Sequence, residues 1–360
     1  MEITVKQLLQ ALSNVDDPDL KKDIVTLGMV QKIDISPSKI YFEVELTTPA
    51  CPMKDMIQHA CTTAVRHFIS KDIDLEIKMT SRVTGQERHE LKGIKNIIAI
   101  ASGKGGVGKS TIAVNLALAL AKTGAKTGLL DADIYGPSIP TMLGLHKSPL
   151  EMREVNGKNM MVPIDKFGIK SISVGLIVEP GQAIVWRGPM ISSALRQLMN
   201  DVDWGDLDYL IIDLPPGTGD IQLTLCQNFP LTGVVLVTTP QQVALDDAEK
   251  AAAMFNMPMI KVPLLGVVEN MSWFTPPELP ENKYYIFGEG GGQKLATQFE
   301  IELLGQIPLS IPVGKGGDEG LPIVASNNDI LSNAFNKMAG QVARQVSIVN
   351  SMKSQNAIPA

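Results

Sequence analysis

The sequence predicts an α/β protein, with a doubly wound, mostly parallel sheet that follows a smaller α/β unit. Five short apolar runs follow one another after residue 95, and several of them end in small or acidic residues. Helical segments separate most of these runs. Continuous apolar strands that alternate with helices are typical of a parallel sheet covered on both faces. The runs lie at 96–102, 127–133, 208–215, 233–240 and 264–270.

The first 81 residues predict the smaller unit. Residues 5–15 have the apolar spacing of a helix and end at a turn-forming Asp-Asp-Pro-Asp. Residues 39–48 alternate apolar and polar side chains as a half-buried strand does. A second helix at 54–69 and a second strand at 74–81 follow. The predicted domains are 1–81, a polar linker at 82–94, a large domain at 95–351 and a flexible tail at 352–360.

The composition indicates a soluble globular protein. Of 360 residues, 44% are hydrophobic and 19% are charged, which allows a sizeable core. The net charge of −6 argues against a surface that coats nucleic acid. The first residues do not resemble a signal peptide, and long apolar runs are missing. We therefore expect a cytoplasmic protein that has neither nucleic acid nor membrane as a partner.

A glycine-rich loop carries the clearest chemical signal. Residues 103–110 read Gly-Lys-Gly-Gly-Val-Gly-Lys-Ser and fit the pattern G-x-x-x-x-G-K-[ST], between a predicted strand and a predicted helix. In such loops the backbone N–H groups and the helix N-terminus bind phosphates. We expect Lys109 to bridge the terminal phosphates of ATP and the Ser110 hydroxyl to bind Mg²⁺. The predicted nucleotide-binding residues are Gly103, Lys104, Gly105, Gly106, Val107, Gly108, Lys109, Ser110 and Thr111.

Carboxylates follow two of the predicted strands. Asp213 ends the run at 208–215 and is expected to hold Mg²⁺ through a coordinated water, with capping of the next helix as the alternative. Asp131 and Asp133 end the run at 127–133. Hydrolysis needs a group that orients the attacking water, and Asp133 is the candidate. Its alternative is an ordinary loop carboxylate, and Asp131 is expected to be structural or near the magnesium shell.

The second lysine of the loop, Lys104, gives a more specific signal. Residues 104–110 resemble the deviant Walker A family, whose loop reads K-G-G-x-G-K-[ST]. The resemblance implies a homodimer that encloses two ATP molecules. It also implies that Lys104 crosses the dimer interface to the phosphates of the partner's nucleotide. The expected catalytic residues are then Lys104, Lys109 and Asp133.

Further blocks of sequence resemble the Mrp/NBP35/ApbC group of iron–sulfur cluster carrier P-loop ATPases. They lie at 131–140, 186–190, 208–220, 238–251, 268–274 and 286–296. Residues 17–30 and 47–57 resemble a MIP18-like domain. The resemblance implies a P-loop NTPase domain preceded by a MIP18-like domain, slow ATP hydrolysis, and client apoproteins and iron–sulfur assembly proteins as partners. It also implies that Asn270 recognises adenine, whereas a strand-end asparagine that bonds its own turn is the alternative.

The chain departs from this group in its cysteines. Most members carry C-x-x-C between the blocks at 268–274 and 286–296, where this chain has none. A [4Fe–4S] cluster, the candidate further cofactor, usually needs about four thiolates. Cys51 precedes a predicted helix, whose N-terminus favours a thiolate, and is the candidate ligand; a structural role stays open. We expect Cys61 and Cys226 to be core residues.

Two other functions stay open. The missing C-x-x-C favours an ATP-switched adaptor that works in cluster assembly without its own cluster. A MinD/ParA-like positioning ATPase is the other alternative, but it would need a basic amphipathic C-terminal helix. The expected helix at 330–353 has only Lys337, Arg344 and Lys353 as cations. The glycine run at 288–292 lacks G-K-[ST] and is expected to be a flexible turn before a helix.

Overall fold

The computed structural model describes residues 3–85, 91, 93–146, 148–155, 157–177, 188–219, 222–223, 225–226, 229–326 and 328–356. These residues form two compact units. Residues 1–84 together with 347–360 make unit 1, and residues 85–346 make unit 2. Residues 86–90 and 92 of the predicted linker at 82–94 lie outside the described residues, and the division between the units falls within this linker.

Unit 1 is a three-stranded sheet with two helices against one face. β3 is antiparallel to β4, and β4 is parallel to β5. Side chains from β4, such as Phe42 and Val44, pack with Leu8 and Ile57 from the helices in one core. The elements are α1 (Val5–Leu12), β1 (Asp16–Asp17), β2 (Lys22–Asp23), β3 (Val30–Ile35), β4 (Lys39–Leu46), α2 (Lys54–Phe68) and β5 (Asp74–Ser81).

The other face of this sheet is polar and holds a buried carboxylate. Glu43 is 5% exposed, and it accepts a hydrogen bond from the Tyr41 hydroxyl at 2.8 Å. Lys32 and Lys78 each lie 3.1 Å from one of its oxygens. The Tyr41 hydroxyl and the two lysines lower the pKa of Glu43 to about 2. The negative charge of Glu43 is therefore compensated by two lysines and a hydroxyl of the same sheet.

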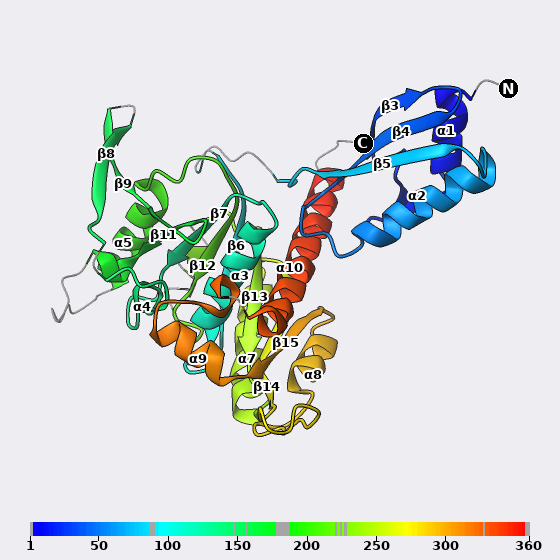
Figure 1. Ribbon diagram of the computed structural model, residues 1–360. Coiled ribbons are helices and arrows are strands. Elements are labelled where there is room, and N and C mark those ends of the chain that lie inside the picture. The colour runs from blue at the N-terminus through cyan, green and yellow to red at the C-terminus, as the bar shows by residue number, and fades with distance from the viewer. Residues whose placement is uncertain are drawn as a thin grey trace. The chain divides into compact units, whose positions relative to one another are not determined.

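Unit 2 is built on an eight-stranded sheet in the order β10-β11-β7-β12-β6-β13-β14-β15 (Figure 1). Every pairing is parallel except β10 with β11. The predicted mostly parallel sheet is thus present, and all five predicted runs are strands of it. The strands are β6 (Ile94–Ala101), β7 (Thr127–Asp131), β10 (Ile164–Lys166), β11 (Ile169–Ser173), β12 (Leu207–Asp213), β13 (Gly233–Thr238), β14 (Leu264–Phe274) and β15 (Leu303–Leu309).

Helices and a hairpin surround this sheet. α3 packs on β6, β7 and β12, whereas α7 packs on β13 and β14. The remaining elements are α3 (Lys109–Lys122), α4 (Ile139–Met142), β8 (Glu151–Val155), β9 (Lys158–Val162), α5 (Gly188–Asn200), α7 (Gln242–Asn256), α8 (Gly291–Gln298), α9 (Ile311–Asp318) and α10 (Asp329–Asn356). α10 continues to Asn356, so five residues of the predicted flexible tail are helical. Among the described residues, none of the helices is long and apolar enough to span a membrane.

Burial on both faces explains the continuous apolar runs. Residues 97–101 of β6 are each at most 1% exposed. Ile97, Ala99 and Ala101 belong to one core cluster, whereas the alternate residues Ile98 and Ile100 point to the opposite face. Because neighbouring parallel strands end at the same edge, this sheet also brings the strand-end carboxylates together: Asp213 of β12 pairs in register with Asp131 of β7.

The glycine run at 288–292 leads into α8 as the sequence predicted, with Gly290 at its N-cap, but its last two glycines are helical and packed. Gly291 and Gly292 form the first turn of α8 and are buried. A Cβ at Gly292 would lie 2.7 Å from the Glu269 Cβ, and one at Gly291 would lie 2.8 Å from the Leu245 side chain. The Gly292 N–H donates to the Glu269 carboxylate at 2.6 Å. The glycines therefore allow α8 to pack closely on β14 and α7.

Candidate functional site

The phosphate loop connects β6 to α3 and needs its glycines. Gly106 and Gly108 have φ angles of +81° and +82°, in the left-handed region that favours glycine. A Cβ at Gly108 would overlap the side-chain amide of Asn270. A Cβ at Gly103 would overlap the backbone of Asp247 on α7. Backbone shape and close packing both fix these residue types.

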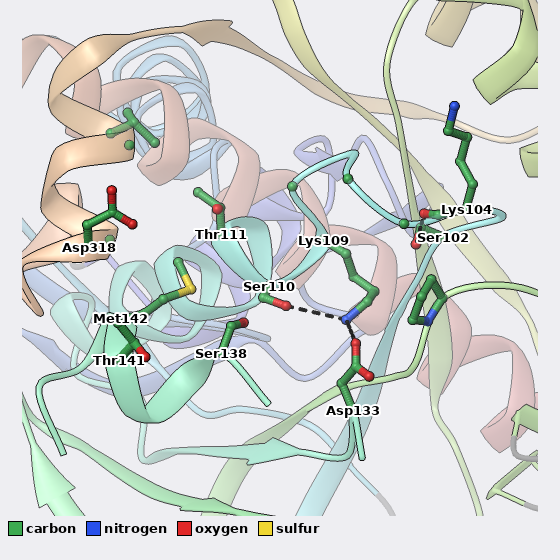
Figure 2. Close-up of a pocket in the computed structure, with 17 residues that line it drawn as sticks. Ser102, Lys104, Lys109, Ser110, Thr111, Asp133, Ser138, Thr141, Met142 and Asp318 are labelled. Atoms are coloured by element: carbon green, nitrogen blue, oxygen red, sulfur yellow. Dashed lines mark hydrogen bonds and ion pairs between the residues drawn. The ribbon is translucent and has the colours of Figure 1, made fainter. Parts of the chain in front are cut away.

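Lys109 lies between two carboxylates at the carboxyl edge of the sheet. Its side chain is 6% exposed, and its Nζ donates to Asp213 Oδ1 at 2.6 Å. The same Nζ lies 3.5 Å from Asp133 Oδ2 and 3.4 Å from the Ser110 hydroxyl (Figure 2). Burying an ammonium is costly unless it is paired, so this cluster holds the lysine charge at the mouth of the loop.

Asp213 is fully buried, and one of its oxygens is unused. Oδ2 lacks a hydrogen-bond partner within the part of the chain that the structure describes. Burial raises the pKa of Asp213, and the adjacent Lys109 charge opposes that rise. An unpaired carboxylate oxygen beside the Ser110 hydroxyl matches the all-oxygen ligand set that Mg²⁺ prefers. The residues at this position therefore fit a magnesium ion.

Asp131 has a different environment from Asp133. Asp131 is 0% exposed, and it accepts hydrogen bonds from the Ser173 hydroxyl at 2.8 Å and from the Asp133 and Ile139 N–H groups at 3.1 and 3.3 Å. Burial raises its pKa to about 7, with the nearby Asp213 charge as the second cause. Asp131 thus fixes the segment from β7 to α4, whereas Asp133 reaches the cavity with its side chain 11% exposed.

A cavity of about 440 Å³ opens at the phosphate loop. It extends from Lys109 and Ser110 past Thr111 to α4 and α9 (Figure 2). This far end was not predicted, because α9 belongs to no motif and lies far along the chain from α4. The lining residues are Ser102, Lys104, Gly105, Gly106, Gly108, Lys109, Ser110, Thr111, Asp133, Ser138, Thr141, Met142, Pro216, Val313, Gly314, Gly317 and Asp318.

Of the predicted nucleotide contacts, Gly103, Val107 and Asn270 are not among the lining residues of this cavity, and Lys104 lies at its edge. Asn270 is 5% exposed and donates to the Val107 carbonyl at 2.9 Å, so it supports the loop from β14 and is not among the lining residues. Lys104 lies at the rim, and Figure 2 shows its side chain directed away from the Lys109 ammonium. The structure therefore places one lysine inside the site and the other on its outer side.

Cys51 and Cys61 belong to unit 1, and Cys226 belongs to unit 2. Cys61 of α2 and Cys226 are buried, and burial raises the pKa of each thiol to about 12. Cys51 is partly exposed and lies shortly before α2 in unit 1. Among the described residues there is no group of three or more His, Cys, Asp and Glu side chains arranged to hold a metal ion. The geometry of one chain thus provides Cys51 alone as an accessible thiol.

Comparison with known proteins supports the resemblances that the motifs indicated. Residues 93–344 match the NUBPL iron-transfer P-loop NTPase family, and residues 6–72 match an iron–sulfur cluster assembly protein family. The chain is 46% identical over 351 residues to a protein of Synechocystis named iron-sulfur cluster carrier protein, covering 96% of this chain and 99% of that relative. A relative of the same name from Deinococcus radiodurans is also 46% identical, over 95% of each chain.

One solved structure is similar to this chain in both fold and sequence. The nucleotide-binding protein of Archaeoglobus fulgidus in complex with ADP is 39% identical, has a TM-score of 0.56, and covers 64% of this chain and 88% of its own. The predicted fold class and family are confirmed by these matches. The chain belongs to the NUBPL-type iron-transfer P-loop NTPase family and carries an iron–sulfur cluster assembly domain at its N-terminus.

Proposed function

We propose that this protein is a homodimeric, cytoplasmic ATPase that carries iron–sulfur clusters and loads them onto client apoproteins. The observation that carries the proposal is the buried Lys109–Asp213 pair, with its unused carboxylate oxygen, at the end of the phosphate loop. A buried charge cluster of this kind costs stability and is typical of a functional site. The names of the relatives support the cluster cargo.

Each residue of the site has a separate role in binding or hydrolysing ATP. The backbone N–H groups of 103–111 surround the phosphates, and Lys109 exchanges Asp213 for the terminal phosphate oxygens. Asp213 and Ser110 would hold Mg²⁺, which supplies positive charge that neutralises the phosphates. Asp133 orients the attacking water because its carboxylate is the one that reaches the cavity from β7. We expect slow turnover, as suits a switch.

The remaining nucleotide contacts come from both sides of the loop. The cavity past Thr111 offers the exposed Asp318 carboxylate to ribose hydroxyls. Asn270 remains the candidate for adenine recognition. Its Nδ2 donates one hydrogen bond to the Val107 carbonyl, which leaves the second N–H and the amide oxygen for a base. Loss of Asn270 should therefore loosen the loop as well as weaken base selectivity.

Lys104 is proposed to act on the nucleotide of a second copy. Its side chain leaves the cavity of its own chain (Figure 2), so a partner's phosphates are the natural target for its charge. A cation that arrives only when two chains close around ATP links nucleotide binding to dimer closure.

The cargo is assigned to Cys51. It is the accessible thiol, and its position before α2 favours the thiolate that binds iron. One Cys51 from each copy gives two ligands, so thiols from a partner protein or a small thiol must complete a [4Fe–4S] shell. The absence of cysteine between Asn270 and Phe287 favours a second function, an ATP-switched adaptor without its own cluster.

Anaerobic reconstitution with iron and sulfide separates these two functions. Wild type, Cys51→Ala and the buried-thiol control Cys226→Ala are compared with and without Mg-ATP, followed by transfer to an apo-ferredoxin. The carrier predicts transferable iron in wild type and Cys226→Ala, and none in Cys51→Ala. If wild type binds ATP but holds no stable iron, the protein is the ATP-switched adaptor and not the carrier.

A further inference from the structure

The loop that follows Asp213 has few backbone hydrogen-bond donors. Residues 214–217 read Leu-Pro-Pro-Gly, and the two prolines have no N–H group. Pro216 is exposed, whereas Pro215 is buried and its carbonyl needs a donor. Gln222 supplies it, because its Nε2 donates to the Pro215 carbonyl at 2.8 Å and to the Pro216 carbonyl at 3.1 Å. Gln222 is 2% exposed, so its amide serves this loop and not the solvent.

The same loop is bonded to the phosphate loop. The Leu214 N–H donates to the Ile100 carbonyl at 3.1 Å, and the Gly217 N–H donates to the Ser102 carbonyl at 2.8 Å. Gly217 has a φ of +99°, so this second bond depends on a backbone shape that favours glycine. The Ser102 hydroxyl in turn donates to the Lys104 carbonyl at 2.9 Å.

These bonds make a continuous path from Gln222 to Lys104. The amide of Gln222 holds the two prolines, the next residue, Gly217, holds Ser102, and Ser102 holds the backbone of Lys104. Pro216 also lines the cavity, and a Cβ at Gly105 would lie 3.9 Å from its ring. Gln222 itself is not among the lining residues, so it would act on the reaction through the loop residues that it holds.

We propose that Gln222 is a positioning residue that holds the loop after Asp213 against the phosphate loop and thereby sets Lys104 for turnover. The inference rests on the proposed function, in which Lys104 contributes to hydrolysis. The groups that hold the nucleotide, namely the loop N–H groups, Lys109 and Ser110, have no bond to Gln222. Removing the amide donor should therefore lower kcat and leave nucleotide affinity nearly unchanged.

Three variants test this role. Gln222→Met keeps the volume and removes both donors, whereas Gln222→Glu keeps the shape and can donate once when protonated. Leu225→Met is the control, because Leu225 is 1% exposed in the same segment and offers no donor. The measurements are kcat and KM for ATP, the affinity for a fluorescent ADP analogue, and Tm, all on the full-length protein.

We expect Gln222→Met to lower kcat at least about tenfold with KM and ADP affinity within about threefold of wild type, since small misplacements reduce turnover strongly. Gln222→Glu should be intermediate, with a kcat that rises relative to wild type as the pH falls. Leu225→Met should resemble wild type. An unchanged kcat in Gln222→Met, or an equal loss of ADP affinity and turnover, would overturn the proposal.

A double-mutant cycle with Lys104→Ala tests the path itself. If Gln222 acts through Lys104, Gln222→Met should cost little further kcat once Lys104 is gone. Fully additive losses would overturn this path. A Lys104→Ala variant with unchanged kcat would instead refute the proposed role of Lys104, and with it the assignment of Gln222 to that lysine. The two failures are therefore distinguishable.

Discussion

Two buried carboxylates, Glu43 in unit 1 and Asp213 in unit 2, differ in how their charge is matched. Glu43 has a tyrosine hydroxyl and two lysines around it, which lower its pKa to about 2. Asp213 has one lysine, an orphaned oxygen and a raised pKa. Protein groups alone compensate the charge of Glu43, so its role is structural. One oxygen of Asp213 has no hydrogen-bond partner among the described residues, which predicts that a ligand binds there.

The nucleotide site and the candidate thiol ligand differ in how many of the residues they need come from one chain. The nucleotide site of unit 2 draws its lysine, carboxylates and hydroxyl from a single chain. The thiol chemistry of unit 1 has Cys51, and the described residues around it do not form a metal-binding cluster. ATP binding should therefore be a property of each chain, whereas cluster binding should require more than one.

The largest expected effect comes from Lys109. Lys109→Met removes the charge that bridges the phosphates and leaves Asp213 without its partner, and breaking a buried pair costs about 3–5 kcal/mol. We expect loss of measurable ATP binding and a lower Tm. Calorimetric titration with Mg-ATP checks this, with Lys122→Met at the other end of α3 as the control. ATP affinity close to wild type in Lys109→Met would contradict the site.

Asp213→Asn is expected to have the next largest effect. The amide keeps the shape but loses the charge that favours Mg²⁺, so Mg²⁺ should no longer increase ATP affinity, and ATP hydrolysis should no longer be measurable. The control is Asp208→Asn, which lies on the same strand and pairs with Lys95 at 2.7 Å. A Mg²⁺ dependence equal to wild type would show that Asp213 is not the magnesium residue.

Lys104→Ala tests whether turnover at the ATP site of one chain needs a residue of a second chain. Each chain should still bind ATP, while kcat falls about 10³-fold, the smaller effect of a cation supplied in trans. Mixing Lys104→Ala with Asp213→Asn should restore turnover, because the second variant supplies Lys104 to the intact site of the first. ATPase assays of each variant and of the mixture measure this. A mixture as inactive as its components would contradict action across an interface.

The smallest effect concerns Glu43 and pH. Its folded pKa of about 2 lies below the ordinary value of 4.5, so its contribution to stability is present above pH 4.5 and is lost as the pH falls toward 2. Glu43→Gln should therefore lower stability at neutral pH, and the difference from wild type should shrink in acid. Denaturant unfolding between pH 3 and 7 tests this, with the exposed Glu76→Gln as the control. A difference that grows in acid would contradict the assignment.

The sequence predicted the elements that have a local signal. The five apolar runs are strands because both faces of the sheet are covered, and the loop at 103–110 follows from its glycines. β11 and β15 were missed because their segments contain polar residues, Gly305 or Pro308. The Asn-Gly at 156–157 is a hairpin signal that the prediction did not use.

Contacts between distant residues could not be predicted in the same way. The pairing of Lys109 with Asp213 spans 104 residues, and the bond from Asn270 to Val107 spans 163. The order of the strands in the sheet brings such residues together. Lys109 and Asp213 meet because β6, which precedes the phosphate loop, lies beside β12. Gln222 has no motif of its own, so only its bonds to the prolines reveal a role.

Native mass spectrometry of anaerobically reconstituted protein shows whether ATP and the cluster need one chain or two, because it measures ATP, iron and chain number in one species. The account predicts one ATP per chain and a cluster that appears on dimers or partner-bound chains and is lost in Cys51→Ala. Iron bound stoichiometrically to an isolated monomer, or retained in Cys51→Ala, would contradict it.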